Sequence, residues 1–141
     1  MIDKKSGTLT IGQDVQFGPQ VAFKILKDLK LGESAEIIGS IDAIEQKLKF
    51  NNVKVENNYY IFRLSFELNR LFMLEIFISP GPFMFKKSWT HWSYEDELKH
   101  LEYCTAWLQH EVGATRNFTW GHIWCGYDSL GGYSSIKIRY V

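Results

Sequence analysis

Apolar side chains occupy every second position between residues 59 and 68. The even positions of this segment are all apolar, whereas the odd positions include Arg63, Ser65 and Glu67. A period of two is typical of a β-strand that buries one face and exposes the other. We therefore predict a half-buried strand over residues 59–68.

Turn-forming residues on both sides extend this strand into a meander. Asn57-Asn58 precede it and Asn69-Arg70 follow it. We predict antiparallel strands over residues 53–56, 59–68 and 71–78. Pro80 and Pro82 then prevent continuous pairing, so residues 83–87 are expected to form only a short edge segment.

Helical spacing replaces this alternation nearer the N-terminus. After Gly18-Pro19, apolar side chains recur with a helical period at Val21, Ala22, Ile25, Leu26 and Leu29. They predict an amphipathic helix of about three turns that ends before Gly32. Ala35 to Ile38 is a short apolar run. Ser40 is then placed to cap a second, smaller helix with a stripe of Ile41, Ile44 and Leu48.

The longest predicted helix covers residues 93–112. Ser93 and Asp96 have the spacing of a capping box, and Gly113 is expected to form the C-cap. The acidic residues of the first turn complement the helix dipole better than they suggest acid–base chemistry. The expected buried stripe is Tyr94, Leu98, Leu101, Thr105, Leu108 and Val112.

Two strands, at residues 118–127 and 133–141, complete the pattern. Burying one face requires Cys125 to lie opposite Ile136 and Ile123 opposite Ile138, with a hairpin loop that contains Gly131-Gly132. The predicted fold is a single α+β domain over residues 1–141. It has a mainly antiparallel, twisted sheet of about five to six strands, packed with two N-terminal helices and one longer helix at about 93–112.

The composition argues against several classes of protein. The chain has 16 basic and 16 acidic residues, so it lacks the charge excess of a protein that coats nucleic acid or an anionic membrane. The N-terminal residues form no secretory signal, and the apolar segment from Leu71 to Phe85 is too short for a membrane helix. Two cysteines are too few for a disulfide framework, so we expect a reduced, cytoplasmic protein.

Common catalytic and metal-binding motifs are poorly represented. His100 and Cys104 share a helix face, but no second ligand pair has a recognisable spacing, so no metal is expected. Gly131-Gly132 lies between two strands and forms no phosphate-binding loop. We expect no catalytic residue and no cofactor, although Cys125 assisted by His110 or His122 stays open as a nucleophile.

The second face of the final hairpin is the candidate contact surface. The same register pairs Trp124 with Lys137 and His122 with Arg139, and Trp120 continues the row. Aromatic and cationic side chains of this kind are enriched at protein interfaces. A further aromatic group lies in the loop before the long helix and consists of Trp89, His91 and Trp92.

Two other interpretations of this surface remain open. The 93–112 helix could cover the face, with Lys137 and Arg139 extending past it into solvent. Bases of single-stranded nucleic acid could stack on the tryptophans, but the neutral charge argues against a nucleic-acid partner.

The C-terminal third of the chain resembles a known type of protein. The segments Trp120-Gly121-His122-Ile123, Gly126-Tyr127-Asp128 and Gly131–Tyr140 look like the C-terminal hairpin of small bacterial immunity proteins. These are cytoplasmic inhibitors encoded beside the toxins of polymorphic and contact-dependent growth inhibition systems. The resemblance implies a non-enzymatic protein that binds a cognate toxin domain and occludes its surface, with no catalytic residue of its own.

The chain departs from the pattern of this family in its charge. Inhibitors of basic nuclease toxins are often acidic, whereas this chain is neutral. If the resemblance holds, the toxin is less basic or is bound away from its active site. The alternatives are a secretion chaperone and a small enzyme or ligand-binding domain with a pocket near His110, His122, Cys125 and Asp128.

Overall fold

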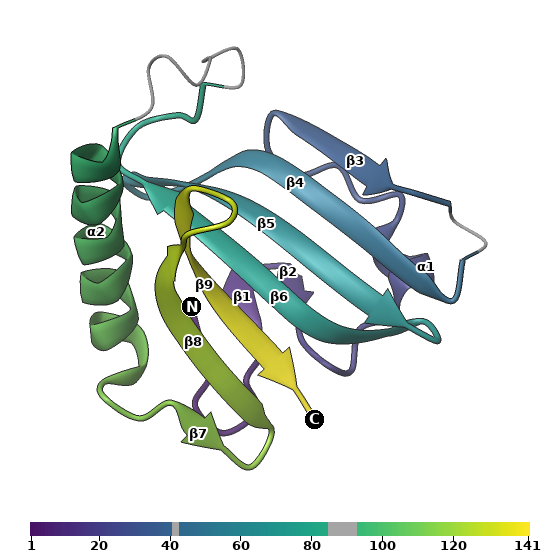
Figure 1. Cartoon of the computed structure of the whole chain (residues 1–141). Helices are drawn as coiled ribbons and strands as arrows, with labels where there is room; N and C mark the ends of the chain where they lie inside the picture. Colours follow the sequence, from purple (N-terminus) through teal and green to yellow (C-terminus); the bar gives the residue numbers. More distant parts are fainter. Residues whose placement is uncertain (41–42, 85–92) are drawn as a thin grey trace.

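The computed structural model describes residues 1–40, 43–84 and 93–141. Its main feature is a twisted, antiparallel sheet of seven strands in the order β3-β4-β5-β6-β9-β8-β7 (Figure 1). The strands are β3 (Ser34–Ile38), β4 (Glu45–Val55), β5 (Asn58–Glu67), β6 (Arg70–Ser79), β7 (Asn117–Phe118), β8 (Gly121–Asp128) and β9 (Tyr133–Tyr140). The C-terminal β9 thus lies inside the sheet, between β6 and β8.

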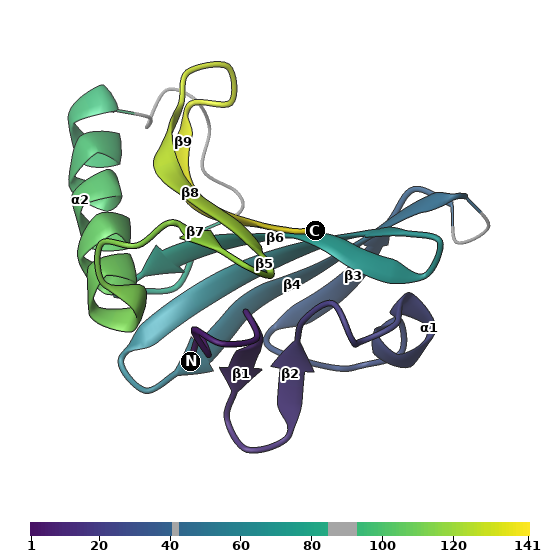
Figure 2. The ribbon, with the colours of Figure 1, turned by 90° about the horizontal axis from the view of Figure 1, so that it is seen from below.

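A small second layer covers one face of this sheet. It contains the two-stranded hairpin of β1 (Leu9–Ile11) and β2 (Val15–Phe17) and the short helix α1 (Phe23–Leu26). Figure 2 shows these elements below the sheet, with the long helix α2 (Tyr94–Val112) standing at one end beside β8 and β9. All these elements contribute side chains to one hydrophobic core.

Strand β5 supplies the centre of the core. Its side chains at Tyr60, Phe62, Leu64 and Phe66 are almost completely buried. Phe17 of β2 packs edge-on against Phe62, with ring centroids 5.4 Å apart. The predicted half-buried strand is confirmed over these four even positions, which face the core. Leu68, the last even position of the prediction, lies beyond β5 and is 78% exposed.

The antiparallel pairing of the predicted meander and final hairpin is also confirmed, although β4 begins at Glu45 and not at residue 53, and β8 begins at Gly121 and not at residue 118. Strands β4, β5 and β6 pair antiparallel in sequence, and β6 ends at Ser79, directly before Pro80. In the hairpin, Cys125 lies opposite Ile136 and Ile123 opposite Ile138, as predicted. Of the expected edge segment 83–87, Phe83 and Met84 lie outside any strand, and the rest lies outside the described residues.

The first predicted N-terminal helix is mostly wrong. Only Phe23–Leu26 is helical, and Ile25, expected on the buried stripe, is 67% exposed. Ala22 forms a β-bridge with Arg70, and the Phe23 N–H donates to the Asn69 carbonyl over 3.2 Å. These bonds tie the chain to the β5–β6 turn, so regular helix cannot begin earlier.

The second predicted helix is wrong, because its residues 45–48 form the start of β4; Ile41 of its stripe lies outside the described residues. Ile44 is 71% exposed, whereas Leu48 and Phe50 point into the core with a period of two. The apolar run from Ala35 to Ile38 forms β3, which pairs with β4. The sheet therefore has seven strands and not five to six, and β1 and β2 form an additional hairpin that the sequence pattern did not predict.

The long helix agrees with its predicted bounds, but only Leu108 and Val112 of its expected stripe are buried. The Ser93 side chain accepts a hydrogen bond from the Asp96 N–H over 3.4 Å, and Gly113 ends the helix with a φ of 71°. Its fully buried side chains are Cys104, Leu108 and Val112. Tyr94 and Leu98 are exposed, because polar side chains of the first turns make the contacts to the sheet instead.

Candidate functional site

One face of the main sheet is not covered by any helix or strand within the described ranges (Figure 2). The β1–β2 hairpin and α1 pack on the opposite face, where the core lies. We call the uncovered side the open face. Strands β8 and β9 curve up from it at one end, so the open face is bounded on that side by the hairpin.

The strand register places two rows of side chains across the open face. The first row runs through Glu36, Lys49, Arg63, Glu75, Lys137 and Trp124. The second row runs through Ile38, Lys47, Ser65, Met73, Arg139 and His122. Each row crosses six strands, because alternation keeps every second residue of a strand on the same face.

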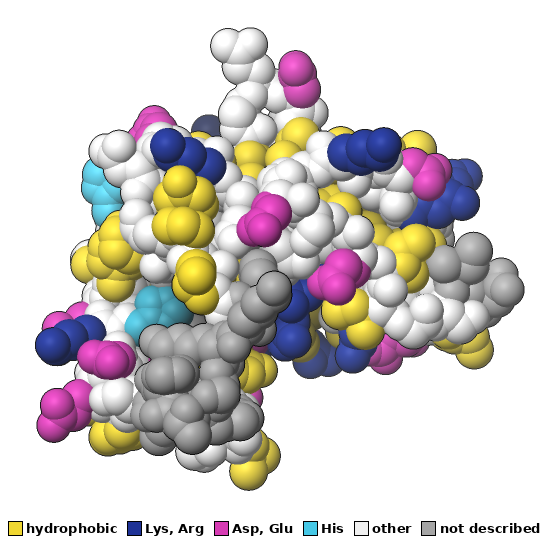
Figure 3. Space-filling view, turned by 90° about the horizontal axis from the view of Figure 1, so that it is seen from above, with side chains coloured by type: hydrophobic (Ala, Val, Ile, Leu, Met, Phe, Trp, Pro, Cys, Tyr) yellow, Lys and Arg dark blue, Asp and Glu magenta, His cyan; other side chains and the backbone are white. Residues whose placement is uncertain are grey.

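These rows are rich in cations. They contain five lysine or arginine side chains and only two carboxylates, although the whole chain has a net charge of zero. Figure 3, in which the open face is turned to the lower side, shows Lys and Arg side chains gathered in a hollow there. The neutral composition therefore does not exclude a local excess of cations in these two rows.

Glu75 holds the centre of the first row. It is 8% exposed, and its carboxylate accepts a hydrogen bond from the Ser135 hydroxyl over 2.9 Å. Arg63 Nη1 lies 3.5 Å and Lys137 Nζ 4.0 Å from its two oxygens. A buried carboxylate needs such partners, and here they fix the two cations at the middle of the open face.

The two predicted pairs at the end of the rows are present. Lys137 Nζ lies 5.0 Å from the centre of the Trp124 ring, which is the geometry of a cation–π contact. Trp124 is 38% exposed, and α2 does not cover it, because α2 contacts the other side of the hairpin through Thr105 and Cys125. His122 and Arg139 are opposite one another and exposed.

Trp120 does not continue this row, so that prediction is wrong. It lies in the tight turn between β7 and β8, where strand alternation no longer applies, and it is 8% exposed. Its ring stacks on Phe118, and its indole N–H donates to the Lys4 carbonyl over 2.8 Å. Trp120 is a core residue on the side of Tyr140. Trp89, His91 and Trp92 lie outside the described residues.

Two hollows lie on either side of Arg63. One has a volume of about 280 Å³ and is lined mainly by Ile38, Lys47, Met73, Glu75 and Lys137. The other has a volume of about 250 Å³ and is lined by Lys49, Ile61, Phe77, Phe83 and Tyr133, with Glu97 and His100 of α2. Both combine an apolar floor with cationic side chains at the rim.

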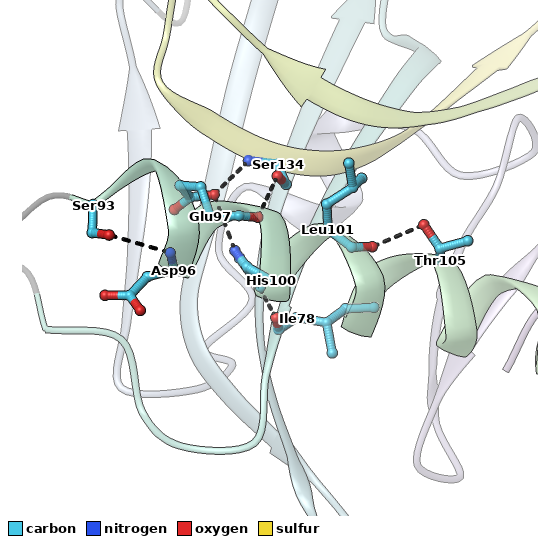
Figure 4. A network of polar contacts seen from close by, with 8 residues as sticks. All are labelled: Ile78, Ser93, Asp96, Glu97, His100, Leu101, Thr105 and Ser134. Carbon is cyan, nitrogen blue, oxygen red and sulfur yellow. Dashed lines mark hydrogen bonds and ion pairs between the residues drawn. The ribbon is translucent and has the colours of Figure 1, made fainter.

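Polar contacts between α2 and the sheet border the second hollow (Figure 4). Glu97 accepts a hydrogen bond from the Ser134 N–H over 3.0 Å and lies 3.5 Å from His100 Nδ1. His100 Nε2 also contacts the Ile78 carbonyl. Burial disfavours a charged imidazole, but hydrogen bonds to Cys104 and Glu97 outweigh it and raise the pKa of His100 to about 10.

The residues of the alternative pocket are not brought together. Cys125 faces α2, with its sulfur 3.7 Å from Thr105 Oγ1, and burial raises the pKa of its thiol. His122 projects to the opposite face of the same strand, and His110 is exposed near the end of α2. Asp128 accepts hydrogen bonds from the Leu130 and Gly131 N–H groups, which confirms it as a turn residue.

The described residues offer little for a metal or a membrane. No three His, Cys, Asp or Glu side chains among them are grouped closely enough to hold a metal ion. No helix in the same ranges combines the length and hydropathy that crossing a bilayer requires.

The sequence pattern missed half of the open face. Lys47 was not identified as a candidate residue, because residues 41–48 were assigned to a helix. Lys49 lies just beyond that helix, and Arg63 was placed on the polar side of its strand but was not connected with the final hairpin. The alternation of Lys47, Leu48, Lys49 and Phe50 is the signal that places both lysines on the solvent side of a strand.

Comparison with known proteins gives a fold likeness. No family model matches this chain, and no curated protein matches it. A similar solved structure is a chain of Rhs1-CT in complex with its cognate immunity protein RhsI1. The match has a TM-score of 0.55 and 16% sequence identity, and it covers 99% of this chain and 85% of the other. This chain therefore shares the fold of a protein from a toxin–immunity complex.

Proposed function

We propose that this protein is a non-enzymatic inhibitor that binds a cognate bacterial toxin domain and occludes its surface. The observation that carries the proposal is the fold likeness to a chain of a toxin–immunity complex, which extends over 99% of the chain. The C-terminal hairpin suggests the same class from its sequence. In this proposal the protein acts in the cytoplasm of the cell that makes the toxin, as in polymorphic or contact-dependent growth inhibition systems.

The geometry of the hairpin supports a role in binding. We place His122, Trp124, Lys137 and Arg139 in the toxin interface, because all four lie on the open face at the end of the two rows. An exposed tryptophan beside cations has the composition of an interface hot spot. Trp89, His91 and Trp92 are proposed as further contacts on the basis of their sequence alone.

The proposal is favoured over an enzyme by the separation of the rival residues. His122 and Cys125 project to opposite faces of β8, and Asp128 is engaged in a turn. A nucleophile and its base must lie within hydrogen-bonding reach of one another. The described residues of this candidate set do not meet that requirement.

Co-expression with the toxin domain encoded by the adjacent gene tests the function. We expect both polypeptides to copurify, native mass spectrometry to show a stoichiometric complex, and cells expressing the toxin to survive. A toxin domain from an unrelated system serves as the control and should not bind. The proposal is wrong if no complex forms and the cells are not rescued. A secretion chaperone would instead form a stable homodimer and bind several clients loosely.

A further inference from the structure

We infer that the open face binds an acidic segment of the partner protein, whose carboxylates occupy the hollow between Lys47, Arg63 and Lys137. This inference rests on the proposed function and names the surface and the chemistry of its partner. It extends the contact surface from the final hairpin across β4, β5 and β6.

The charge of the open face is the first line of support. Lys47, Lys49 and Arg63 on β4 and β5 face the same way as Lys137 and Arg139 on β9. The carboxylates in the two rows are Glu36, near the edge, and Glu75, which is buried. The next row adds the exposed Glu45 and Glu67, and Glu45 lies 3.7 Å from Lys47 Nζ. At the hollow itself, three cations surround one buried carboxylate, which favours association with a carboxylate of the partner.

Glu75 orients two cations at the centre of this face, so that they can also bind a carboxylate of the partner. Its own oxygens already bind Ser135, Arg63 and Lys137, so it orients the two cations without projecting into solvent. The side chains of Arg63, Lys137 and Lys47 are 42%, 33% and 51% exposed and keep free surface at the hollow. Side chains held in place before binding lose less conformational entropy when a partner docks.

The hollows themselves fit protein side chains. The 280 Å³ hollow combines the apolar Ile38 and Met73 with three cations, which suits an aspartate or glutamate together with its aliphatic carbons. The 250 Å³ hollow is lined by Ile61, Phe77 and Tyr133, which suits a neighbouring apolar side chain. Interfaces between proteins typically combine an apolar centre with a polar, solvent-accessible rim.

The same features disfavour a nucleic acid on this face. Binding a phosphate backbone depends on neutralising several successive phosphates, and the net charge of this chain is zero. Stacking of successive bases needs several accessible aromatic rings, whereas Trp124 is the single Trp, Tyr or Phe side chain in the two rows. A protein with clustered carboxylates is therefore the better partner.

An NMR titration with two anionic probes tests the face directly. The full chain, labelled with ¹⁵N, is titrated with a deca-glutamate peptide and with a deoxythymidine decamer. We expect the peptide to shift the amide signals of Lys47, Arg63, Lys137 and their neighbours. The effect should weaken as the salt concentration is raised from about 0.01 to about 0.5 M, since exposed charges are then screened.

A matched pair of charge-reversal variants makes the test specific. In Lys47→Glu/Arg139→Glu both changes lie in the second row, away from the buried Glu75, so the fold should be retained. In Lys24→Glu/Lys27→Glu the same change in charge is made at exposed positions around α1, beneath the opposite face. We expect the first variant to bind deca-glutamate at least about tenfold more weakly and the second to bind like the wild type.

Each outcome decides a separate point. The inference is overturned if deca-glutamate shifts no open-face signal, if both variants lose binding equally, or if the deoxythymidine decamer binds more tightly than the peptide.

The same variants are then tested against the toxin domain. If the wild type binds the toxin and Lys47→Glu/Arg139→Glu binds equally well, the surface assignment fails while the function stands. If the wild type binds no toxin, the function fails, and the peptide titration still decides whether the face selects acidic polypeptides.

Discussion

Ser134 and Glu97 are joined by two hydrogen bonds that connect β9 to α2. The Ser134 N–H donates to Glu97 Oε2 over 3.0 Å, and the Ser134 hydroxyl donates to the Glu97 carbonyl over 3.2 Å. Ser134 is fully buried, so its N–H and hydroxyl groups depend on partners within the protein. The pair fixes the helix against the hairpin that carries Lys137 and Arg139.

Removing the Glu97 carboxylate should destabilise the protein. Glu97→Ala leaves the buried Ser134 N–H without an acceptor, and we expect the free energy of unfolding to fall by about 1–3 kcal/mol. Glu97→Gln keeps an oxygen in place and should lose less. Urea unfolding measures both. Glu102→Ala, at an exposed position of the same helix, is the control and should change stability by no more than about 0.5 kcal/mol. Equal stabilities of Glu97→Ala and the control would contradict the role of the contact.

The imidazole of His100 should remain protonated at neutral pH in the folded protein. Hydrogen bonds to Cys104 and Glu97 outweigh burial and raise its pKa to about 10, whereas an unfolded chain has a value near 6.5. Side-chain NMR of the folded protein should therefore show an imidazolium signal throughout pH 6 to 8. A sample unfolded in urea provides the reference, and a folded His100 that titrates near pH 6.5 would refute this prediction.

The same shift makes the contribution of His100 to stability depend on pH. Because the folded pKa lies above the unfolded one, the stabilisation is complete below about pH 6.5 and is lost as the pH rises towards 10. The difference in unfolding free energy between wild type and His100→Gln should therefore shrink over this range. A difference that stays constant from pH 6 to 10 would show that the proton does not contribute.

Substitution of Trp120, in the β7–β8 turn, should destabilise the protein more than substitution of Trp124, in β8. Trp120 is packed against Phe118 and Tyr140, so Trp120→Ala should lower the unfolding free energy by about 3–5 kcal/mol. Trp120→Phe retains the ring packing and should lose mainly the bond to Lys4, about 1 kcal/mol. Trp124→Ala removes an exposed ring and should lose no more than about 1 kcal/mol. Similar losses at both positions, measured by denaturant unfolding, would disprove the placement of Trp120 in the core.

Gly121 should not tolerate a side chain. A Cβ at this position would lie 2.1 Å from the Arg139 carbonyl oxygen, which belongs to the paired strand β9 and cannot move aside easily. We expect Gly121→Ala to destabilise the protein by about 1–3 kcal/mol or more. Gly81→Ala is the matched control, because a Cβ there would meet nothing within 4 Å. Thermal unfolding of both variants checks the expectation, which fails if the two melt at the same temperature.

The elements that could be predicted from the sequence are those whose residue pattern fits only one type of secondary structure. In β5 and in the β8–β9 hairpin, alternation is strict and turn residues mark both ends, so the faces and the register follow directly. For α2, the Ser93 cap and Gly113 mark both ends. The C-terminal end of its expected stripe is buried, but the first turns contact β9 and β6 through the polar side chains of Glu97 and His100 instead.

The N-terminal third was not predictable in the same way. Ile41, Ile44 and Leu48 fit a helical period, and Leu48 and Phe50 fit a strand equally well. A bulge after Phe50, where Asn52 has a φ of 48°, interrupts the alternation of β4 and hides its length. Pairing with β3 and β5 decides between the two structures, and that choice depends on contacts far along the chain.

The residues of the candidate site likewise fall into a predictable group and an unpredictable group. Trp124, His122, Lys137 and Arg139 were found because both strands of their hairpin are adjacent in sequence. Lys47, Lys49 and Arg63 join them only through the pairing of β6 with β9, which brings Met73 opposite Arg139. Pairing between strands so far apart has no local signature in one sequence.

The interior position of β9 also constrains the order in which the protein folds. Strand β6 has no partner on one side until Ile136 to Arg139 pair with it, although β3 to β6 are synthesised much earlier. During translation the β6 edge therefore stays open until β9 has left the ribosome, and an open edge is prone to pair with other chains. Contacts of this length also slow folding, so the native sheet should form only after synthesis of β9.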